Sequence, residues 1–178
     1  MIKWTRRSIL RRSAALSTMT FLSPVIGPAI VSNALAASSN PLFTLGVASG
    51  DPWPDSVVLW TRLARDPLDG GGMGDTPVAV NWEVAADEGF QRIVQKGTAT
   101  ARVEEAHSVH VEPGGLEPHR WYWYRFNAMG VESAVGRTRT APALDASNDR
   151  LRLALACCQH YEHGHYTAYR HMAGEDLD

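Results

Sequence analysis

Short segments of alternating apolar and polar residues, separated by turn-forming residues, fill the chain from residue 41 to about residue 142. A period of two places successive side chains on opposite faces of an extended strand, and no long helical period interrupts the pattern. Gly, Pro and Asp bound the segments, as expected for strands joined by turns. The pattern predicts seven strands, over Phe43–Ala48, Ser56–Leu63, Val78–Ala85, Ile93–Ala101, His107–Glu112, Arg120–Ala128 and Glu132–Thr138.

Seven short strands within roughly one hundred residues are typical of an all-β immunoglobulin- or fibronectin-like sandwich. The stretch GLEPHRWYWYRF supports this fold class, because Leu116, Pro118 and Tyr122 have the spacing of a tyrosine corner. We therefore expect residues 37–142 to form an N-terminal β-sandwich domain.

Alternation within residues 120–128 predicts two different faces. Tyr122, Tyr124 and Phe126 share one face, and Trp121 and Trp123 lie on the other together with an arginine. Two roles are open for the tryptophans. They form a platform on which a ligand stacks, or they cover a sheet face or a neighbouring domain, and the second role is the commoner one.

The first 36 residues have the three parts of an export signal. A basic stretch is followed by a modestly apolar segment and by Ala34-Leu35-Ala36, which fits an A-x-A cleavage site. The stretch TRRSILR, residues 5–11, resembles a twin-arginine signal. We expect residues 1–36 to engage the twin-arginine export machinery and to direct a periplasmic or secreted location, with an uncleaved amphipathic anchor as the alternative. The apolar segment is too short and too polar to be a stable membrane span.

Charge is distributed unevenly along the chain. Five of the 17 basic residues and none of the 19 acidic residues lie in the first 36 positions, which leaves 12 basic and 19 acidic residues, a net charge of −7, in the remainder. Non-specific nucleic-acid binding needs a basic surface to neutralise phosphates. The acidic body therefore argues against that class of function.

The last 36 residues have a different pattern. The polar stretch ALDASNDR predicts a linker between domains at residues 143–149. Leu151–Ala156 is a continuous apolar run, typical of a strand covered on both faces, and Gly164–Asp176 has helical spacing. We expect residues 150–178 to be the first strand and helix of an α/β domain, whose chemistry would sit just beyond the strand end.

Cys157 and Cys158 follow that predicted strand and are the only cysteines in the chain. A disulfide between neighbouring residues is strained. A thiolate metal ligand, a small buried apolar residue and a cysteine that awaits a partner all remain open.

Three histidines and a glutamate follow the cysteines within six residues. Such side chains are able to bind zinc or copper when the fold brings them together, but a solvated loop is the commoner outcome. The residues are His160, Glu162, His163 and His165.

Together these stretches resemble the PhoD-like family of secreted alkaline phosphatases and phosphodiesterases. The resemblance begins at the twin-arginine signal and continues through FTLGVASGDPWPDSVVLWTRL, WEVAADEGFQRIVQKGTATA, HSVHVEPGGLEPHRWYWYRF and GRTRTAP, in the order expected for the family's N-terminal sandwich. LRLALACCQHYEHGHYTAYRHMAGEDLD resembles the start of the family's metallophosphoesterase domain.

The resemblance implies hydrolysis of phosphate monoesters and diesters at a cluster of iron and calcium. One iron ligand in the family is a cysteine before a glutamine, and Cys158, which precedes Gln159, matches it. Cys157 replaces the serine that is usual there, and the resemblance assigns no role to His160, His163 or His165.

The remaining family ligands come from segments that follow the first helix, and the sequence ends at Asp178. We therefore expect an N-terminal fragment of such an enzyme, with no catalytic residues within this chain and without activity as an isolated chain. A phospholipase D-type phosphodiesterase of the same family and an exported β-sandwich binding module without catalysis are the alternatives.

Overall fold

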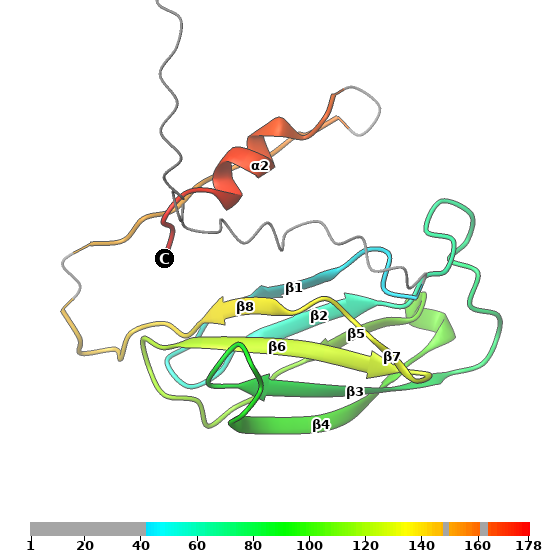
Figure 1. Ribbon diagram of the computed structural model, residues 1–178, viewed down its shortest axis with the longest axis horizontal. Coiled ribbons are helices and arrows are strands. Elements are labelled where there is room, and N and C mark those ends of the chain that lie inside the picture. Colours follow the sequence, from blue (N-terminus) through cyan, green and yellow to red (C-terminus); the bar gives the residue numbers. More distant parts are fainter. Residues whose placement is uncertain (1–41, 148–149, 161–163) are drawn as a thin grey trace, which may run out of the picture. The chain divides into compact units, whose positions relative to one another are not determined.

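Two antiparallel sheets packed face to face make up the strand-rich part of the chain. The computed structural model describes residues 42–147, 150–160 and 164–178. Within these residues the first sheet has the order β1-β2-β5 and the second the order β4-β3-β6-β7, with β8 also pairing with β6 (Figure 1). The strands are β1 (Val47–Gly50), β2 (Val58–Arg62), β3 (Val78–Ala85), β4 (Ile93–Ala101), β5 (Ser108–Val111), β6 (Trp121–Ala128), β7 (Val131–Glu132) and β8 (Gly136–Arg139).

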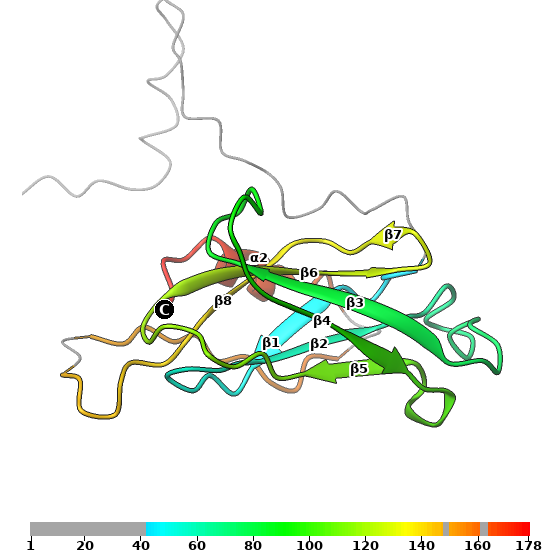
Figure 2. The ribbon, with the colours of Figure 1, turned by 90° about the horizontal axis from the view of Figure 1, so that it is seen from below.

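An apolar core lies between the sheets and confirms the predicted sandwich. Figure 2 shows β1, β2 and β5 as a layer below the one that contains β3 and β6. Leu59 and Val109 reach the core from the first layer and Val80, Val84 and Phe126 from the second, each exposed by 2% or less. Burial of apolar area at about 25 cal/mol per Å² is the main stabilising contribution in such a core.

The predicted faces of β6 are confirmed. Tyr122, Tyr124 and Phe126 are buried in the core, whereas Trp121 and Trp123 are half-buried on the outer face. Aromatic residues thus occupy both faces of β6, and those on the inner face are the buried ones.

A hydrogen bond from the backbone N–H of Glu117 to Oη of Tyr122, 2.8 Å long, forms the predicted tyrosine corner. Leu116, just before it, is buried, and its backbone N–H donates to the carbonyl oxygen of Asp55 at 2.9 Å. The corner therefore ties the loop before β6 both to the core and to the loop before β2.

Two predicted strands differ from the observed ones for local reasons. The segment Phe43–Ala48 is a strand only from Val47 onward, because Gly46 adopts a φ of +72° and its N–H closes a turn on the carbonyl oxygen of Phe43. The segment Glu132–Thr138 divides into β7 and β8. Ser133 separates them: its Oγ accepts a hydrogen bond from the N–H of Phe126 and donates one to Ala134.

The prediction of a strand at Leu151–Ala156 is wrong. The structure has no strand in this segment, and the leucines of the segment face solvent. Leu151, Leu153 and Leu155 are exposed by 68%, 75% and 92%. A strand of this type needs neighbours to pair with and layers to cover both faces, and the described residues supply neither.

The predicted helix is present but shorter. The helix α2 (Thr167–Ala173) begins after Tyr166, whose φ is +50°, and ends at Gly174. A short helical turn, η1 (Val103–Glu105), lies between β4 and β5. Neither helix in the described ranges has the length and apolar character of a membrane-spanning helix.

Candidate functional site

Trp121 and Trp123 lie on the outer face of the second sheet, where β8 runs beside β6. The register places Trp121 opposite Arg139 and Trp123 opposite Arg137, and directly opposite residues share a face. The guanidinium carbons of Arg137 and Arg139 lie 4.2 Å and 5.3 Å from the centroid of the Trp121 ring. An indole ring attracts cations through its quadrupole. Two arginines therefore cover Trp121, which is not an open stacking platform.

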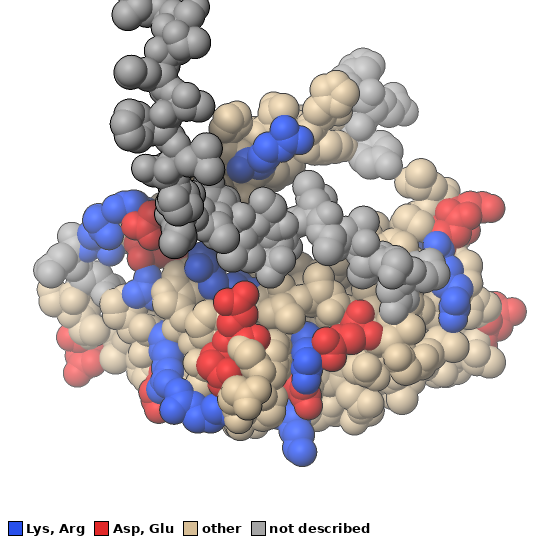
Figure 3. All heavy atoms as spheres, in the orientation of Figure 1, with Lys and Arg blue, Asp and Glu red and all other residues tan. Residues whose placement is uncertain are grey.

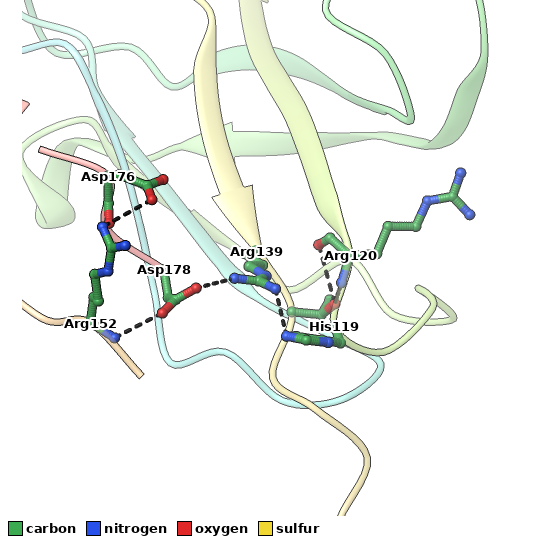
Figure 4. Close-up of polar contacts among 7 residues, drawn as sticks. His119, Arg120, Arg139, Arg152, Asp176 and Asp178 are labelled. Atoms are coloured by element: carbon green, nitrogen blue, oxygen red, sulfur yellow. Dashed lines mark hydrogen bonds and ion pairs between the residues drawn. The ribbon is translucent and has the colours of Figure 1, made fainter. Parts of the chain in front are cut away.

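Arg139 joins three parts of the chain (Figure 4). Its Nη2 donates a hydrogen bond to Nε2 of His119, and its Nη1 donates to Oδ1 of Asp178 at 2.5 Å. Because a guanidinium has only donors, Nε2 of His119 is the acceptor in this contact. Nε of Arg139 is buried and has no hydrogen-bond partner in the described part of the chain.

Asp178 is also hydrogen-bonded to the backbone of Arg152. Its Oδ2 accepts from the Arg152 N–H at 2.8 Å, and its own N–H donates to the Arg152 carbonyl oxygen at 3.1 Å. The bond from the Arg152 N–H is the main cause that holds the pKa of the Asp178 carboxyl below its usual value, and Arg139 adds to it. Asp178 is therefore ionised at neutral pH.

Arg152 makes a second acidic contact with Asp176. Its Nη1 lies 2.9 Å from Oδ2 of Asp176 and donates to the Asp176 carbonyl oxygen at 3.0 Å. The segment after α2 is thus held to residue 152 by both backbone and side-chain bonds.

These contacts border a hollow of about 460 Å³. Its charged and aromatic lining consists of His119, Trp121, Arg137, Arg139, Arg150 and Asp178. Three arginines against one carboxylate make this lining basic, so the hollow favours acidic groups.

A second polar cluster, around Arg125, crosses the outer face of the same sheet. Arg125 pairs with Glu83 at 2.8 Å and with Glu132 at 3.0 Å, and its guanidinium carbon lies 4.2 Å from the ring centroid of Phe90. Basic and acidic side chains are interspersed over the face seen in Figure 3. Because Arg125 already has two carboxylate partners, we assign this cluster to sheet stability rather than to ligand binding.

Cys157 and Cys158 are exposed and form no disulfide. Cys158 has a φ of +55°, so the chain turns at this residue instead of continuing as a strand. His160 and His165 are exposed, while His163 and Glu162 lie outside the described residues.

The described residues offer one part of a metal site. An exposed thiol at Cys158 suits a soft or borderline metal ion once it is deprotonated. In residues 42–147, 150–160 and 164–178, however, no three His, Cys, Asp or Glu side chains lie close enough to hold a metal together. Iron bound with help from Cys158 would need further ligands from elsewhere.

The fold and these contacts define the class of the chain: a β-sandwich domain that ends in a short segment carrying a free cysteine pair. The chain belongs to the PhoD-like phosphatase family, since the model of the "PhoD-like phosphatase, N-terminal domain" matches residues 29–142.

Two relatives agree with this assignment. The chain is 56% identical over 165 residues to "Alkaline phosphatase D" of Bacillus subtilis (strain 168), which covers 93% of this chain and 28% of that protein. A solved structure titled "Structure of PhoD" matches with a TM-score of 0.76 and 60% sequence identity, over 79% of this chain and 27% of that one. The chain thus spans less than a third of the length of each of these two relatives.

The sequence did not predict the contacts of Arg139. Arg139 lies opposite Trp121 because β6 and β8 pair antiparallel. Pairing the two predicted strands in this register would have placed the two residues together. The bond from Arg139 to Asp178 joins residues 39 positions apart and has no local signal in the sequence.

Proposed function

We propose that this chain is the N-terminal sandwich part of a secreted, metal-dependent alkaline phosphatase that hydrolyses phosphate monoesters and diesters. One observation carries the proposal: the 56% identity to alkaline phosphatase D extends over 165 of 178 residues. The chain has 178 residues, so a match over 165 of them extends past the end of the sandwich at residue 142 and includes Cys158. A binding module without catalysis would not need that segment.

Within this proposal Cys158 is a thiolate ligand to iron, and further oxygen ligands for iron and calcium come from outside the described residues. Bound cations would polarise the phosphoryl oxygens and stabilise the charge that develops on the leaving group. Cys158 would contribute by holding its metal. Its exposed, unbridged thiol supports the assignment.

The isolated chain should not hydrolyse phosphate esters, because one proposed ligand cannot hold a metal cluster. The choice among monoesters, diesters and phospholipids, the last as in a phospholipase D-type phosphodiesterase, would depend on the catalytic part. A separate role as an exported binding module is less well supported, since arginines cover Trp121.

The proposal includes export by the twin-arginine machinery, supported by the stretch TRRSILR and the A-x-A sequence within residues 1–36. Replacing Arg6 and Arg7 by lysine should retain the protein in the cytoplasm. Cell fractionation of both forms tests this, and unchanged export would contradict it.

A chimera tests the phosphatase assignment directly. Residues 1–178 of this chain replace the matching segment of Bacillus subtilis alkaline phosphatase D. The chimera should hydrolyse p-nitrophenyl phosphate and bis(p-nitrophenyl) phosphate, and the full chain alone should hydrolyse neither. A chimera that folds and binds metal but remains inactive would contradict the proposal.

The same chimera tests Cys158 against its neighbour. Cys158→Ser should lose iron, measured by mass spectrometry of the acid-digested protein, together with activity. Cys157→Ser is the matched control and should keep both. Iron retained after Cys158→Ser would overturn the ligand assignment and leave the family assignment standing.

A further inference from the structure

The two ends of the segment that carries the cysteines are joined to each other. Arg152 and Asp178 exchange two hydrogen bonds, of 2.8 Å and 3.1 Å, and the Arg152 side chain adds contacts with Asp176. The bonds between Arg152 and Asp178 therefore close a neck, and Cys157, Cys158 and α2 lie between its two sides in the chain. Closing a loop removes chain entropy, so bonds at the neck restrict everything between them.

Arg139 connects this neck to the sandwich. Arg139 is in β8 and Asp178 is in the neck. Their ion pair links the sandwich to the neck within the described residues (Figure 4). The side chains of Arg139 and Asp178 are 20% and 25% exposed, so the pair is partly shielded from water. Partial shielding reduces the screening that weakens ion pairs at an open surface.

We propose that Arg139, together with Trp121 and His119, is a docking surface for the acidic segment Asp176–Asp178 of the same chain. Binding of this segment holds the neck, and with it the loop that carries Cys158, against the outer face of the sandwich. The inference goes beyond the proposed function and does not depend on it, because it concerns how the loop is anchored and requires no activity.

Preorganisation distinguishes Arg139 from the other arginines on this face. Its guanidinium lies over the Trp121 ring and donates to His119, which leaves Nη1 directed at Asp178. A side chain already fixed by other contacts loses less entropy on binding its partner. Arg137 lies closer to the same ring, but it is exposed and has no ion pair among the described residues. It therefore serves as a matched control.

Charge complementarity supports the choice of partner. The segment after α2 carries Glu175, Asp176 and Asp178, and Arg150 adds positive charge beside Asp178. Opposite charges across a contact fix its register and make it sensitive to salt. Glu175 has no ion pair within the described ranges and provides the control on the acidic side.

Hydrogen–deuterium exchange of the full chain tests the docking. In Arg139→Gln, exchange of the Arg152 and Asp178 amides should rise about fivefold, the range expected for loss of one partly exposed ion pair. Asp178→Asn should give the same result, and Arg137→Gln and Glu175→Gln should change the exchange of these amides little. Moderate salt should reproduce the effect in the parent chain and not in Arg139→Gln.

Two results would overturn the proposal. One is unchanged exchange at the neck in both Arg139→Gln and Asp178→Asn. The other is an equal rise in Arg137→Gln, which would show that net charge, not this contact, matters. The β6 amides monitor the sandwich in the same experiment. If the β6 amides also exchange faster in Arg139→Gln, the Asp178 amide of Asp178→Asn decides. This side chain lies outside both sheets, and the substitution leaves the backbone bond from the Asp178 N–H to the Arg152 carbonyl oxygen in place. Neither result tests the proposed function, which the activity of the chimera decides separately.

Discussion

Replacing Gly136 by alanine tests how β8 closes over the core. Gly136 is the register partner of Tyr124, and a Cβ added to it would lie 2.3 Å from Cζ of the Tyr124 ring. Carbon atoms pack best at about 3.5–4.0 Å, so one of the two residues has to move. Tyr124 has little room, since it is 2% exposed and its ring lies edge-on to Phe126 at 6.3 Å between centroids.

The expected loss of stability follows from two opposing contributions. Forcing an extra methyl group into a packed core costs about 1–3 kcal/mol. Replacing glycine by alanine recovers about 0.4–1 kcal/mol, because the unfolded chain loses conformational freedom. Gly136→Ala should therefore destabilise the folded state by about 1–2 kcal/mol, which lowers Tm by roughly 5–15 °C for a domain of about 100 residues.

Thermal unfolding of the full chain, followed by circular dichroism, measures this change. Gly50→Ala is the matched control, because a Cβ at Gly50 in β1 meets nothing within 4 Å; its Tm should stay the same or rise slightly. Adding Tyr124→Val to Gly136→Ala should cost less than the sum of the two single changes, since the clash is gone. A Gly136→Ala variant as stable as Gly50→Ala would refute the packing of Tyr124 against β8.

Two further substitutions test turns of the sandwich. Tyr122→Phe leaves the Glu117 N–H without its acceptor and should lower stability by about 1 kcal/mol in denaturant unfolding; an unchanged midpoint would contradict the tyrosine corner. Asp87 accepts hydrogen bonds from the N–H groups of Gln91 and Arg92, and the bond from Gln91 chiefly holds the pKa of the Asp87 carboxyl below its usual value. Because the folded-state pKa is lowered, this stabilisation is present above about pH 4 and is lost as the pH falls further. The Tm of Asp87→Ala should thus lie below that of the parent at neutral pH, and the two should converge in acid; a constant difference would contradict the assignment.

The sandwich could be predicted where local pattern and tertiary structure agree. The bounds of β3 and β4 follow from period-two alternation, and the burial of Tyr122 and Tyr124 follows from the same period in β6. The pattern failed where one residue altered the backbone. Gly46 delays the start of β1 through its positive φ, and Ser133 lies where the pairing with β6 is interrupted between β7 and β8.

The last segment shows the limit of reading burial from composition. The apolar run at Leu151–Ala156 predicts a strand only if other strands and helices cover it, and apolar character alone does not supply them. The docking contact of Arg139 was not predictable either, because Asp178 is 39 positions away and an arginine in a sequence gives no signal of its distant partner. Whether Cys158 binds iron stays a prediction, since the sequence names one ligand and the described residues add no others.

The most direct test of the proposed function starts from the natural secreted product, captured with an antibody against the sandwich. Its intact mass, iron content and hydrolysis of p-nitrophenyl phosphate are measured on the same sample. A phosphatase that contains this sandwich should have a mass well above the 19.5 kDa of this chain, bound iron and activity. A product of 19.5 kDa or less, without iron and without hydrolysis, would contradict the proposal and favour a binding role.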